Sequence, residues 1–362
     1  MRRGGPHARI KLRARPDPLP TLDAPLTDPS PSPLRLAPGV LLCAALALAA
    51  WALQLAEVAL FRHAVVEALV IAMLLGVAVR TAWTPTRRFE PGIKLTAKQV
   101  LEVAVVLLGA SVDLPLLLRA GPALAGAIAA VVLAGLGCGY AVGRALGLNP
   151  RLSTLIACGN AICGNSAIAA VAPVIGAERE DVASSIAFTA VLGVVVVLGL
   201  PLLRPLLGYG DYQYGVLAGM TVYAVPQVLA ATFPVSALSG EVGTLVKLVR
   251  VLLLGPVVVF FSFRHRKIGT QRLNPASFVP WFIAGFLVLA AARSLGVIPA
   301  GAAGAVREAS RWLTVAAMAA LGLGVDVRAL GKVGPRVMLA VVASLAVMIT
   351  ASVLLIGMLG IG

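Results

Sequence analysis

The chain has 362 residues, of which 59% are hydrophobic and only 12% are charged, and its mean hydropathy is +0.96. Soluble proteins carry about 25% charged residues, so this composition excludes a water-exposed globular domain and predicts that lipid surrounds most of the chain. The net charge of +15 comes from basic residues placed between apolar runs. That pattern is typical of cytoplasmic loops and argues against nucleic-acid binding.

Residues 1–36 are rich in proline, lysine and arginine and predict a disordered basic cytoplasmic tail, followed by one transmembrane domain over 37–362. This domain contains eleven apolar runs: 37–58, 63–82, 99–118, 121–142, 152–176, 182–203, 213–233, 242–263, 278–297, 308–327 and 336–360. If the runs alternate across a membrane, most basic residues fall on one side, which predicts a cytoplasmic N-terminus and an external C-terminus. We therefore expect an all-α polytopic membrane protein with about eleven transmembrane helices.

A short pattern, L-G-x-x-V-D followed seven residues later by Gly-Pro, begins at residue 108 and again at residue 321, an offset of 213 residues. The offset covers an odd number of predicted helices, so the two copies run in opposite directions and predict an inverted repeat. The two aspartates of the pattern are Asp113 and Asp326. Each follows an apolar helix and favours capping of the next segment, with ion coupling as the alternative.

Residues 156–176 contain two Gly-Asn pairs near the middle of a predicted span. Amide side chains are costly in lipid and glycine allows the backbone to unwind, so we predict that residues 159–166 are non-helical and that a new half-helix runs to about residue 175. The N–H groups at its start would form an anion site. The alternative is an intact helix whose small residues allow close packing. The candidate substrate-binding residues in this run are Asn160, Gly164, Asn165 and Ser166.

Two later runs add polar groups. Pro226 interrupts one of them beside Gln227, with the hydroxyl of Tyr223 one turn earlier, and these features predict either a substrate contact or a simple proline kink. Lys247 and Arg250 are three residues apart and share one helix face. They predict either the lining of an anion path near the outer surface or charges that extend to the lipid headgroups. Tyr223, Gln227, Lys247 and Arg250 complete the candidate substrate-binding set.

Other site chemistry has little support in the sequence. The four cysteines lie in apolar runs without metal-ligand spacing, and the three histidines lie in the tail or at helix ends. We therefore expect no metal site, no cofactor, no catalytic residues and no enzymatic activity. The expected partners are the lipid bilayer, a small anion and a coupling ion, either a proton or sodium. The sequence leaves open a homodimer, and it does not decide whether residues 152–176 and 213–233 span the membrane or re-enter.

Five segments are distinctive beyond their composition: PGIKLTAKQVLEVAVVLLG, ICGNSAIAAVAPVIGA, VKLVRVLLLGPVVV, PWFIAGF and AMAALGLGVDVRAL. Together they resemble the bacterial sulfate exporter family, a group of uncharacterised inner-membrane proteins, over about residues 63–360. The resemblance implies a distant relation to bile-acid/sodium symporters and cation–proton antiporters, whose fold has inverted repeats and broken crossing helices. It also implies transport of sulfate or of a related sulfur oxyanion or sulfonate.

The chain departs from that family at three points. The family usually has a small residue where Asn165 stands and a His-Glu pair where Tyr223 and Ala224 stand, so a proton role does not transfer to these positions. The resemblance further implies a second broken helix after Asp326, whereas the Tyr223–Gln227 run precedes it.

We expect a secondary active transporter of a small anion that works by alternating access. One alternative is a cation or proton antiporter, which would need paired intramembrane carboxylates that the middle runs almost entirely lack. The other alternative is a non-transporting structural membrane protein.

Overall fold

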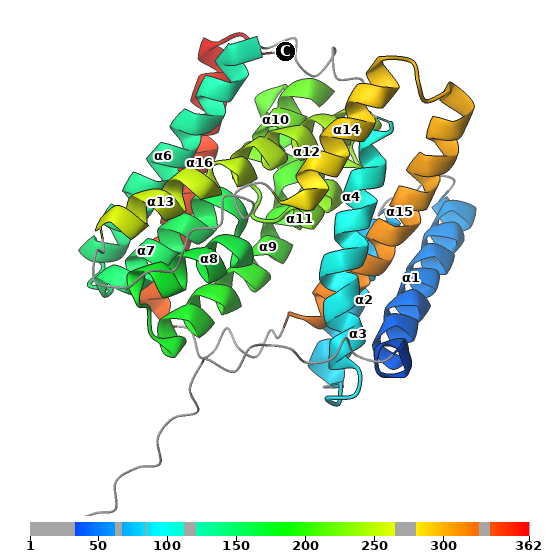
Figure 1. Ribbon diagram of the computed structural model, residues 1–362, viewed down its shortest axis with the longest axis horizontal. Helices are drawn as coiled ribbons and strands as arrows, with labels where there is room; N and C mark the ends of the chain where they lie inside the picture. Colours follow the sequence, from blue (N-terminus) through cyan, green and yellow to red (C-terminus); the bar gives the residue numbers. More distant parts are fainter. Residues whose placement is uncertain are drawn as a thin grey trace, which may run out of the picture.

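The computed structural model describes residues 33–61, 67–83, 85–111, 121–264, 280–325 and 334–361, and every element in these segments is a helix (Figure 1). The elements are α1 (Pro33–Phe61), α2 (Ala68–Ala82), α3 (Glu90–Leu95), η1 (Thr96–Val100), α4 (Leu101–Gly109), α6 (Gly121–Ala145), α7 (Pro150–Cys158), η3 (Gly159–Cys163), α8 (Asn165–Ile175), α9 (Arg179–Leu207), α10 (Asp211–Thr221), α11 (Val225–Thr232), α12 (Ala237–Leu252), α13 (Leu254–Arg264), α14 (Trp281–Ser294), α15 (Ala300–Leu323) and α16 (Pro335–Met358). The elements η1 and η3 are π-helical. The predicted all-α class is confirmed.

Within the described segments, five helical stretches are long and apolar enough to cross a membrane, namely α1, α6, α9, the stretch from α12 through α13, and α16. The shorter apolar helices are α2, α8 and α14. Each of the eleven apolar runs contains helix, which supports a polytopic membrane protein. The predicted tail and the residues Asp113 and Asp326 lie largely or wholly outside the described segments.

Two helix boundaries differ from the sequence prediction. The first helix begins at Pro33, inside the predicted tail, and the third run begins at Glu90, well before residue 99. Pro91 occupies the first turn there, where a missing N–H costs nothing. Lys94 forms an ion pair with Glu90 at 2.7 Å on the solvent side of the same turn. Charged residues can therefore extend this helix beyond its apolar run.

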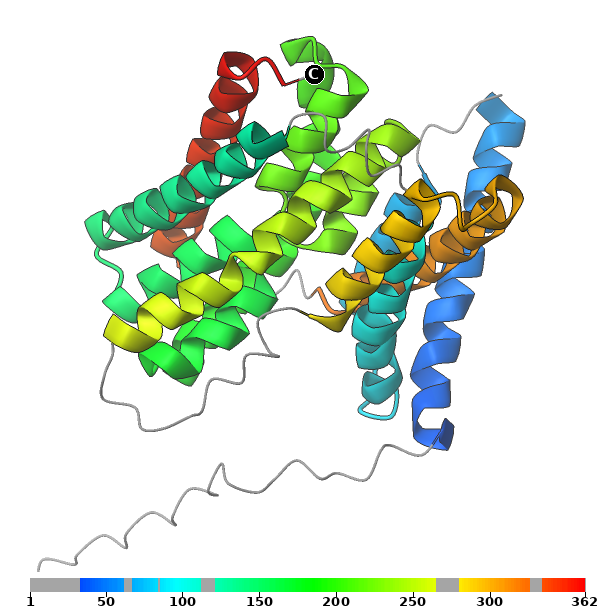
Figure 2. The same ribbon diagram turned by 45° about the horizontal axis from the view of Figure 1, so that its top comes forward.

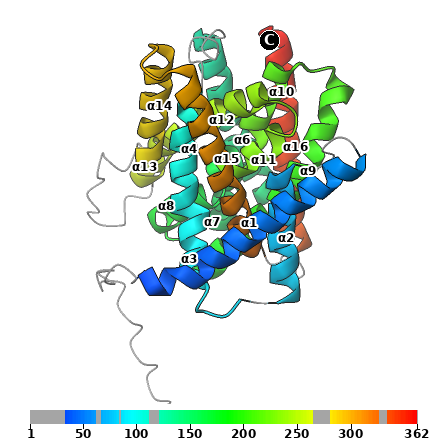
Figure 3. The same ribbon diagram turned by 90° about the vertical axis from the view of Figure 1, so that its right-hand side faces the viewer.

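The helices form two groups that lie side by side (Figure 2). The panel consists of α1, α2, α3, η1, α4, α14 and α15, and the core consists of the elements from α6 to α13 together with α16. The two groups pack through apolar side chains, because Val197 of α9 and Ala230 of α11 belong to the same hydrophobic cluster as residues of α1, α2 and α15. Helix α1 crosses the outside of the panel at a slant, in contact with α2, α3 and α15 (Figure 3).

The repeated pattern lies at the ends of two helix pairs. Within each pair, the two helices pack against each other and run antiparallel. In the α4–α15 pair, Arg307 donates to the Ser111 carbonyl at 3.3 Å, and Ser310, further along α15, donates to Ala104 at 2.7 Å. In the α6–α16 pair, Gly135 faces Met348 and Gly139 faces Ser344. The two helices that end in the copies of the pattern, α4 and α15, are therefore neighbours that run in opposite directions, so the copies lie at opposite ends of this pair.

The two pattern glycines make equivalent contacts. A Cβ on Gly109 would lie 2.3 Å from the Phe286 carbonyl oxygen, and a Cβ on Gly322 would lie 2.2 Å from the Met73 carbonyl oxygen. The contacted residues Met73 and Phe286 are themselves 213 residues apart, the same offset as the two glycines. Helix α2 therefore contacts α15 at a position equivalent to that at which α14 contacts α4.

These contacts predict which glycines of the panel tolerate a methyl group. Gly322→Ala or Gly109→Ala should lower the midpoint of thermal unfolding in detergent, because the methyl group meets backbone that cannot move aside, at a cost of about 1–3 kcal/mol. Gly304→Ala, on the same helix as Gly322, is the matched control because nothing lies within 4 Å of its added Cβ. Equal midpoints for G322A and G304A would contradict the described packing.

Candidate functional site

The first interruption in the core is a hairpin that folds back on itself. We call residues 150–175, which are α7, η3, Gly164 and α8, the first hairpin. Asn149 at its start donates from Nδ2 to Asp181 at 2.9 Å, and Arg151 forms an ion pair with Glu178 at 3.2 Å. Residues before and after the hairpin therefore lie at the same end of the molecule, and this run folds back on itself.

The break in the first hairpin is shorter than predicted. Residues 159–163 remain helical, but in a π-helical turn in which the Gly164 N–H donates to Gly159 O at 2.9 Å. The chain leaves the helix only at Gly164, whose φ of 66° and ψ of −125° suit glycine and exclude most other residues. The new helix runs over Asn165–Ile175 as expected. The predicted non-helical segment 159–166 was thus wrong for 159–163, where a wider turn accommodates the first Gly-Asn pair, and for 165–166, which already belong to α8.

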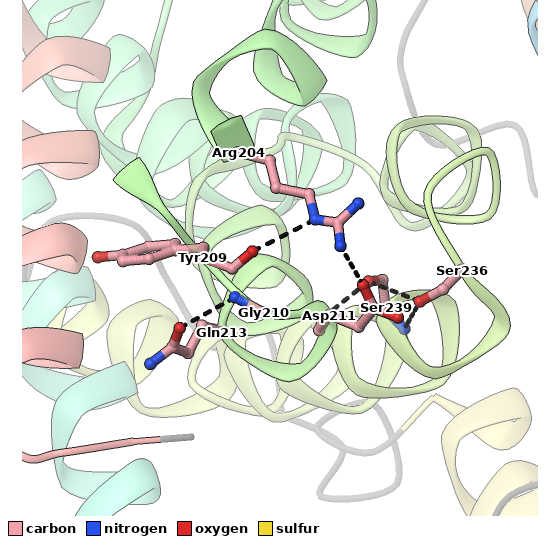
Figure 4. A network of polar contacts seen from close by, with 7 residues as sticks. All are labelled: Arg204, Tyr209, Gly210, Asp211, Gln213, Ser236 and Ser239. Carbon is pink, nitrogen blue, oxygen red and sulfur yellow. Dashed lines mark hydrogen bonds and ion pairs between the residues drawn. The ribbon is translucent and has the colours of Figure 1, made fainter. Parts of the chain in front are cut away.

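A second hairpin, residues 211–232, comprises α10, the three residues after Thr221 and α11. At its base, Arg204 donates to the Asp211 carboxylate at 2.6 Å, and Ser239 donates from Oγ to the Asp211 carbonyl at 2.7 Å (Figure 4). The end of α9, the start of α10 and the start of α12 therefore meet. This run also folds back.

The two hairpins enter the core from opposite ends. Helix α9 begins beside the base of the first hairpin at Glu178 and ends beside the base of the second at Arg204. The tips meet, since a Cβ built on Gly164 would lie 3.5 Å from the Cβ of Tyr223. The core thus has two opposed hairpins where the family resemblance implied broken helices that cross.

Lys247 and Arg250, both on α12, join the two tips. Lys247 donates from Nζ to the Ile162 carbonyl of the first tip and to the Val222 carbonyl of the second, the latter at 2.8 Å. Arg250 spans the same gap. Its guanidinium donates to Asn160 O at 2.9 Å and Ala161 O at 3.1 Å in the first tip, and to Gly219 O at 2.9 Å and Val222 O at 3.2 Å in the second.

The positions of these two cations correct one expectation. Both side chains are 0% exposed, which excludes an extension to the lipid headgroups. At about 1.5 Å per residue, Lys247 lies about 15 Å along α12 from its start at Ala237, deeper than the sequence placed it. Their partners are backbone carbonyls at the ends of half-helices, where the helix dipole is negative. They therefore hold the tips together, a role that the sequence did not indicate.

The half-helix N-termini lie on the other side of the same tips. Asn165, the first residue of α8, accepts from Thr189 Oγ1 of α9 at 2.5 Å. Gln227 of α11 accepts from the Ala224 N–H at 3.2 Å, and its amide packs against Gly193 of α9. Thr189 and Gly193 are one helical turn apart, so the starts of α8 and α11 lie within about 10 Å of each other along α9.

The exposure of the candidate side chains differs between the tips. Asn165 and Ser166 are exposed, Gln227 is half-buried, and Asn160 and Tyr223 are buried. Asn160 donates from Nδ2 to Val341 O at 3.1 Å. In the described part of the chain, its Oδ1 and the Tyr223 hydroxyl are buried without a hydrogen-bond partner. Buried polar atoms without a partner are uncommon in proteins, so each marks a site of interest.

The sequence did not point to Thr189, which donates a hydrogen bond to Asn165, or to Gly193, against which the Gln227 amide packs. The available signal was the set of three hydroxyl residues in the apolar run 182–203, namely Ser184, Ser185 and Thr189, of which Ser185 and Thr189 are one turn apart. Polar side chains at such spacing mark a helix face that meets protein and not lipid.

Two cavities flank the hairpins. One of about 260 Å³ lies between panel and core beside the Arg307–Glu241 ion pair (3.0 Å). The other, of about 670 Å³, lies among α6, α7 and α13, between Tyr140 and Phe260. Tip residues line neither of them. Among the described residues, no group of three or more His, Cys, Asp or Glu side chains could hold a metal ion.

The helical architecture, the apolar helices and the two opposed hairpins define a multi-pass α-helical membrane protein with a transporter-like core. Residues 38–341 match the family described as conserved hypothetical protein 698. The chain belongs to this family.

Its relatives are named UPF0324 membrane proteins. The protein of Bradyrhizobium diazoefficiens is 55% identical over 325 residues, which cover 89% of this chain and 92% of the relative. That of Brucella melitensis is 54% identical over 326 residues, covering 90% and 91%. A more distant relative from Bacillus anthracis is 34% identical over 275 residues, covering 75% and 81%. These names support a membrane protein and assign no substrate.

The hairpins predict an accessibility pattern for single cysteines introduced into a cysteine-free background. Ala145→Cys and Glu180→Cys, which flank the first hairpin, should react with a membrane-impermeant maleimide from one side. Leu206→Cys and Ala237→Cys, which flank the second, should react from the opposite side. If residues 150–175 crossed the membrane, A145C and E180C would label from opposite sides.

Proposed function

We propose that this protein is a secondary active transporter of a small anion, in which the core moves relative to the panel. The observation that carries the proposal is the meeting of two half-helix N-termini, α8 and α11, at the hairpin tips. The first N–H groups of a helix have no partner within it and carry partial positive charge. Two such ends facing one place within a water-poor protein favour a negative ligand.

The charge of the surrounding residues supports an anion over a cation. Neither hairpin contains an Asp or Glu between Leu152 and Ala177 or between Tyr212 and Gly240. Lys247 and Arg250 add two positive charges to the same tips. A cation would therefore meet fixed positive charge without a compensating carboxylate, which weighs against the antiporter alternative.

The polar groups at the tips would supply the remaining contacts. Asn165 and Ser166 are exposed at the start of α8, and the Tyr223 hydroxyl lacks a partner among the described residues. Amide and hydroxyl donors of this kind suit an oxyanion, which accepts several hydrogen bonds. We assign Asn160, Gly164, Asn165, Ser166, Tyr223 and Gln227 to the binding region, and Lys247 and Arg250 to its support.

Alternating access is the proposed mechanism, and an inverted repeat is its proposed structural basis. The antiparallel α4–α15 and α6–α16 pairs and the equivalent contacts of Gly109 and Gly322 support the repeat. Hairpins that enter from opposite ends extend the same symmetry to the site. Such a site can open to either side through movement of one domain against another.

The substrate class and location rest on the sequence resemblance. We propose sulfate or a related sulfur oxyanion or sulfonate as the substrate, and the bacterial inner membrane as the location. We propose transport and not catalysis, with Asp113 and Asp326, both outside the described segments, kept as candidates for ion coupling.

The test is uptake of labelled sulfate, sulfite, thiosulfate and organosulfonates into proteoliposomes. Asn165→Asp should reduce uptake of the best substrate at least about tenfold, equivalent to about 1.4 kcal/mol, because it places a negative charge where the anion binds. Thr189 can still donate to the new carboxylate, so the fold should be retained.

Gln213→Glu is the matched control, because Gln213 accepts from the Gly210 N–H at the base of the second hairpin and a carboxylate can do the same. This variant should transport normally. Normal uptake by N165D, or an equal loss in Q213E, would overturn the assignment of the anion site.

A further inference from the structure

The carbonyl groups between the two tips form a cluster of a kind that binds cations. Asn160, Ala161 and Ile162 end the π-helical turn of the first hairpin, and Gly219 and Val222 end α10. Because each helix stops at its tip, these carbonyls lose their intrahelical N–H partners. Five carbonyl oxygens at two negative helix ends, all in contact with the Lys247 or Arg250 side chain, resemble the oxygen ligands that hard cations take in proteins.

The chain itself occupies this cluster. Lys247 Nζ contacts one carbonyl from each tip, and the Arg250 guanidinium contacts two from each. The contacts come from a single helix, α12, that passes both tips, and both side chains are fully buried. An unpaired ammonium would be expensive to bury, so these carbonyl contacts are what make its burial tolerable.

We propose that the carbonyl cluster is a monovalent-cation site that the protein fills with the Lys247 ammonium, so that the core needs no sodium ion to join its tips. In transporters with broken helices, half-helix carbonyls coordinate the coupling sodium. Here a covalently attached cation takes that position. Together with Arg250 it neutralises the carbonyl ends of both hairpins, which leaves the opposite, N-terminal ends to favour an anion.

The proposal predicts how the folded protein responds to cations, independently of transport. The midpoint of thermal unfolding of the purified wild-type protein should be the same in sodium chloride and in choline chloride. Lys247→Ala should lower the midpoint and create a vacancy, which ammonium or methylammonium should refill with a saturable rise in midpoint. Lys247→Met occupies the same space without charge. It should be destabilised too, but it should not respond to ammonium.

Three outcomes would overturn the proposal. They are a saturable stabilisation of the wild type by sodium, equal responses of K247A and K247M to ammonium, and no response of K247A to any small cation. If K247A cannot be purified, the wild-type titration decides: equal midpoints in sodium and choline support the proposal, and saturable stabilisation by sodium overturns it. The proposal also implies that anion transport does not need sodium. This implication rests on the proposed function and is tested separately, by measuring anion uptake in sodium-free proteoliposomes. If the wild-type protein takes up none of the tested anions, the proposed transport function is refuted, but the effect of cations on the unfolding midpoints still decides the proposal about Lys247.

Discussion

Two interruptions of helix inside an apolar protein create unpaired carbonyl groups, and the rest of the core depends on how these are satisfied. Backbone polar groups cannot remain unpaired where water is scarce. Lys247 and Arg250 supply the missing donors to both hairpins from one helix face. That pairing fixes the tips against each other and thereby fixes the directions in which α8 and α11 begin. These two side chains thereby set the position of the helix starts to which we assign the proposed anion site.

Much of the fold could be predicted from the sequence, because apolar runs and glycine positions carry a direct physical signal. The runs located the helices, and Gly164 and the start of α8 at Asn165 lie within the predicted interruption. Re-entry could not be predicted, since a hairpin and a span need the same apolar composition. The contacts that reveal it join residues 27 to 32 positions apart, as in Arg151–Glu178 and Asn149–Asp181.

The site was less predictable for a related reason. Lys247 and Arg250 were recognised as unusual, but their partners are backbone carbonyls 25 to 90 residues away, and a carbonyl leaves no mark in the sequence. The order of the proposed repeat becomes intelligible through contacts as well. Helix α16 packs against α10, and α6 packs against α7. In the repeat that we propose, the first hairpin follows its pattern and the second hairpin precedes its pattern, so the two halves differ in the order of their elements.

The joining of both tips by α12 also constrains how the chain is made. The first hairpin is synthesised some 85 residues before the side chains that pair with its carbonyls. Until α12 emerges from the ribosome, the polar ends of α7 and η3 have no donors in their final environment. Such a hairpin is unstable by itself in the hydrocarbon of the bilayer, because its carbonyl groups would be unpaired there. We therefore expect the first hairpin to pack stably in the core only once residues 247 and 250 have been synthesised.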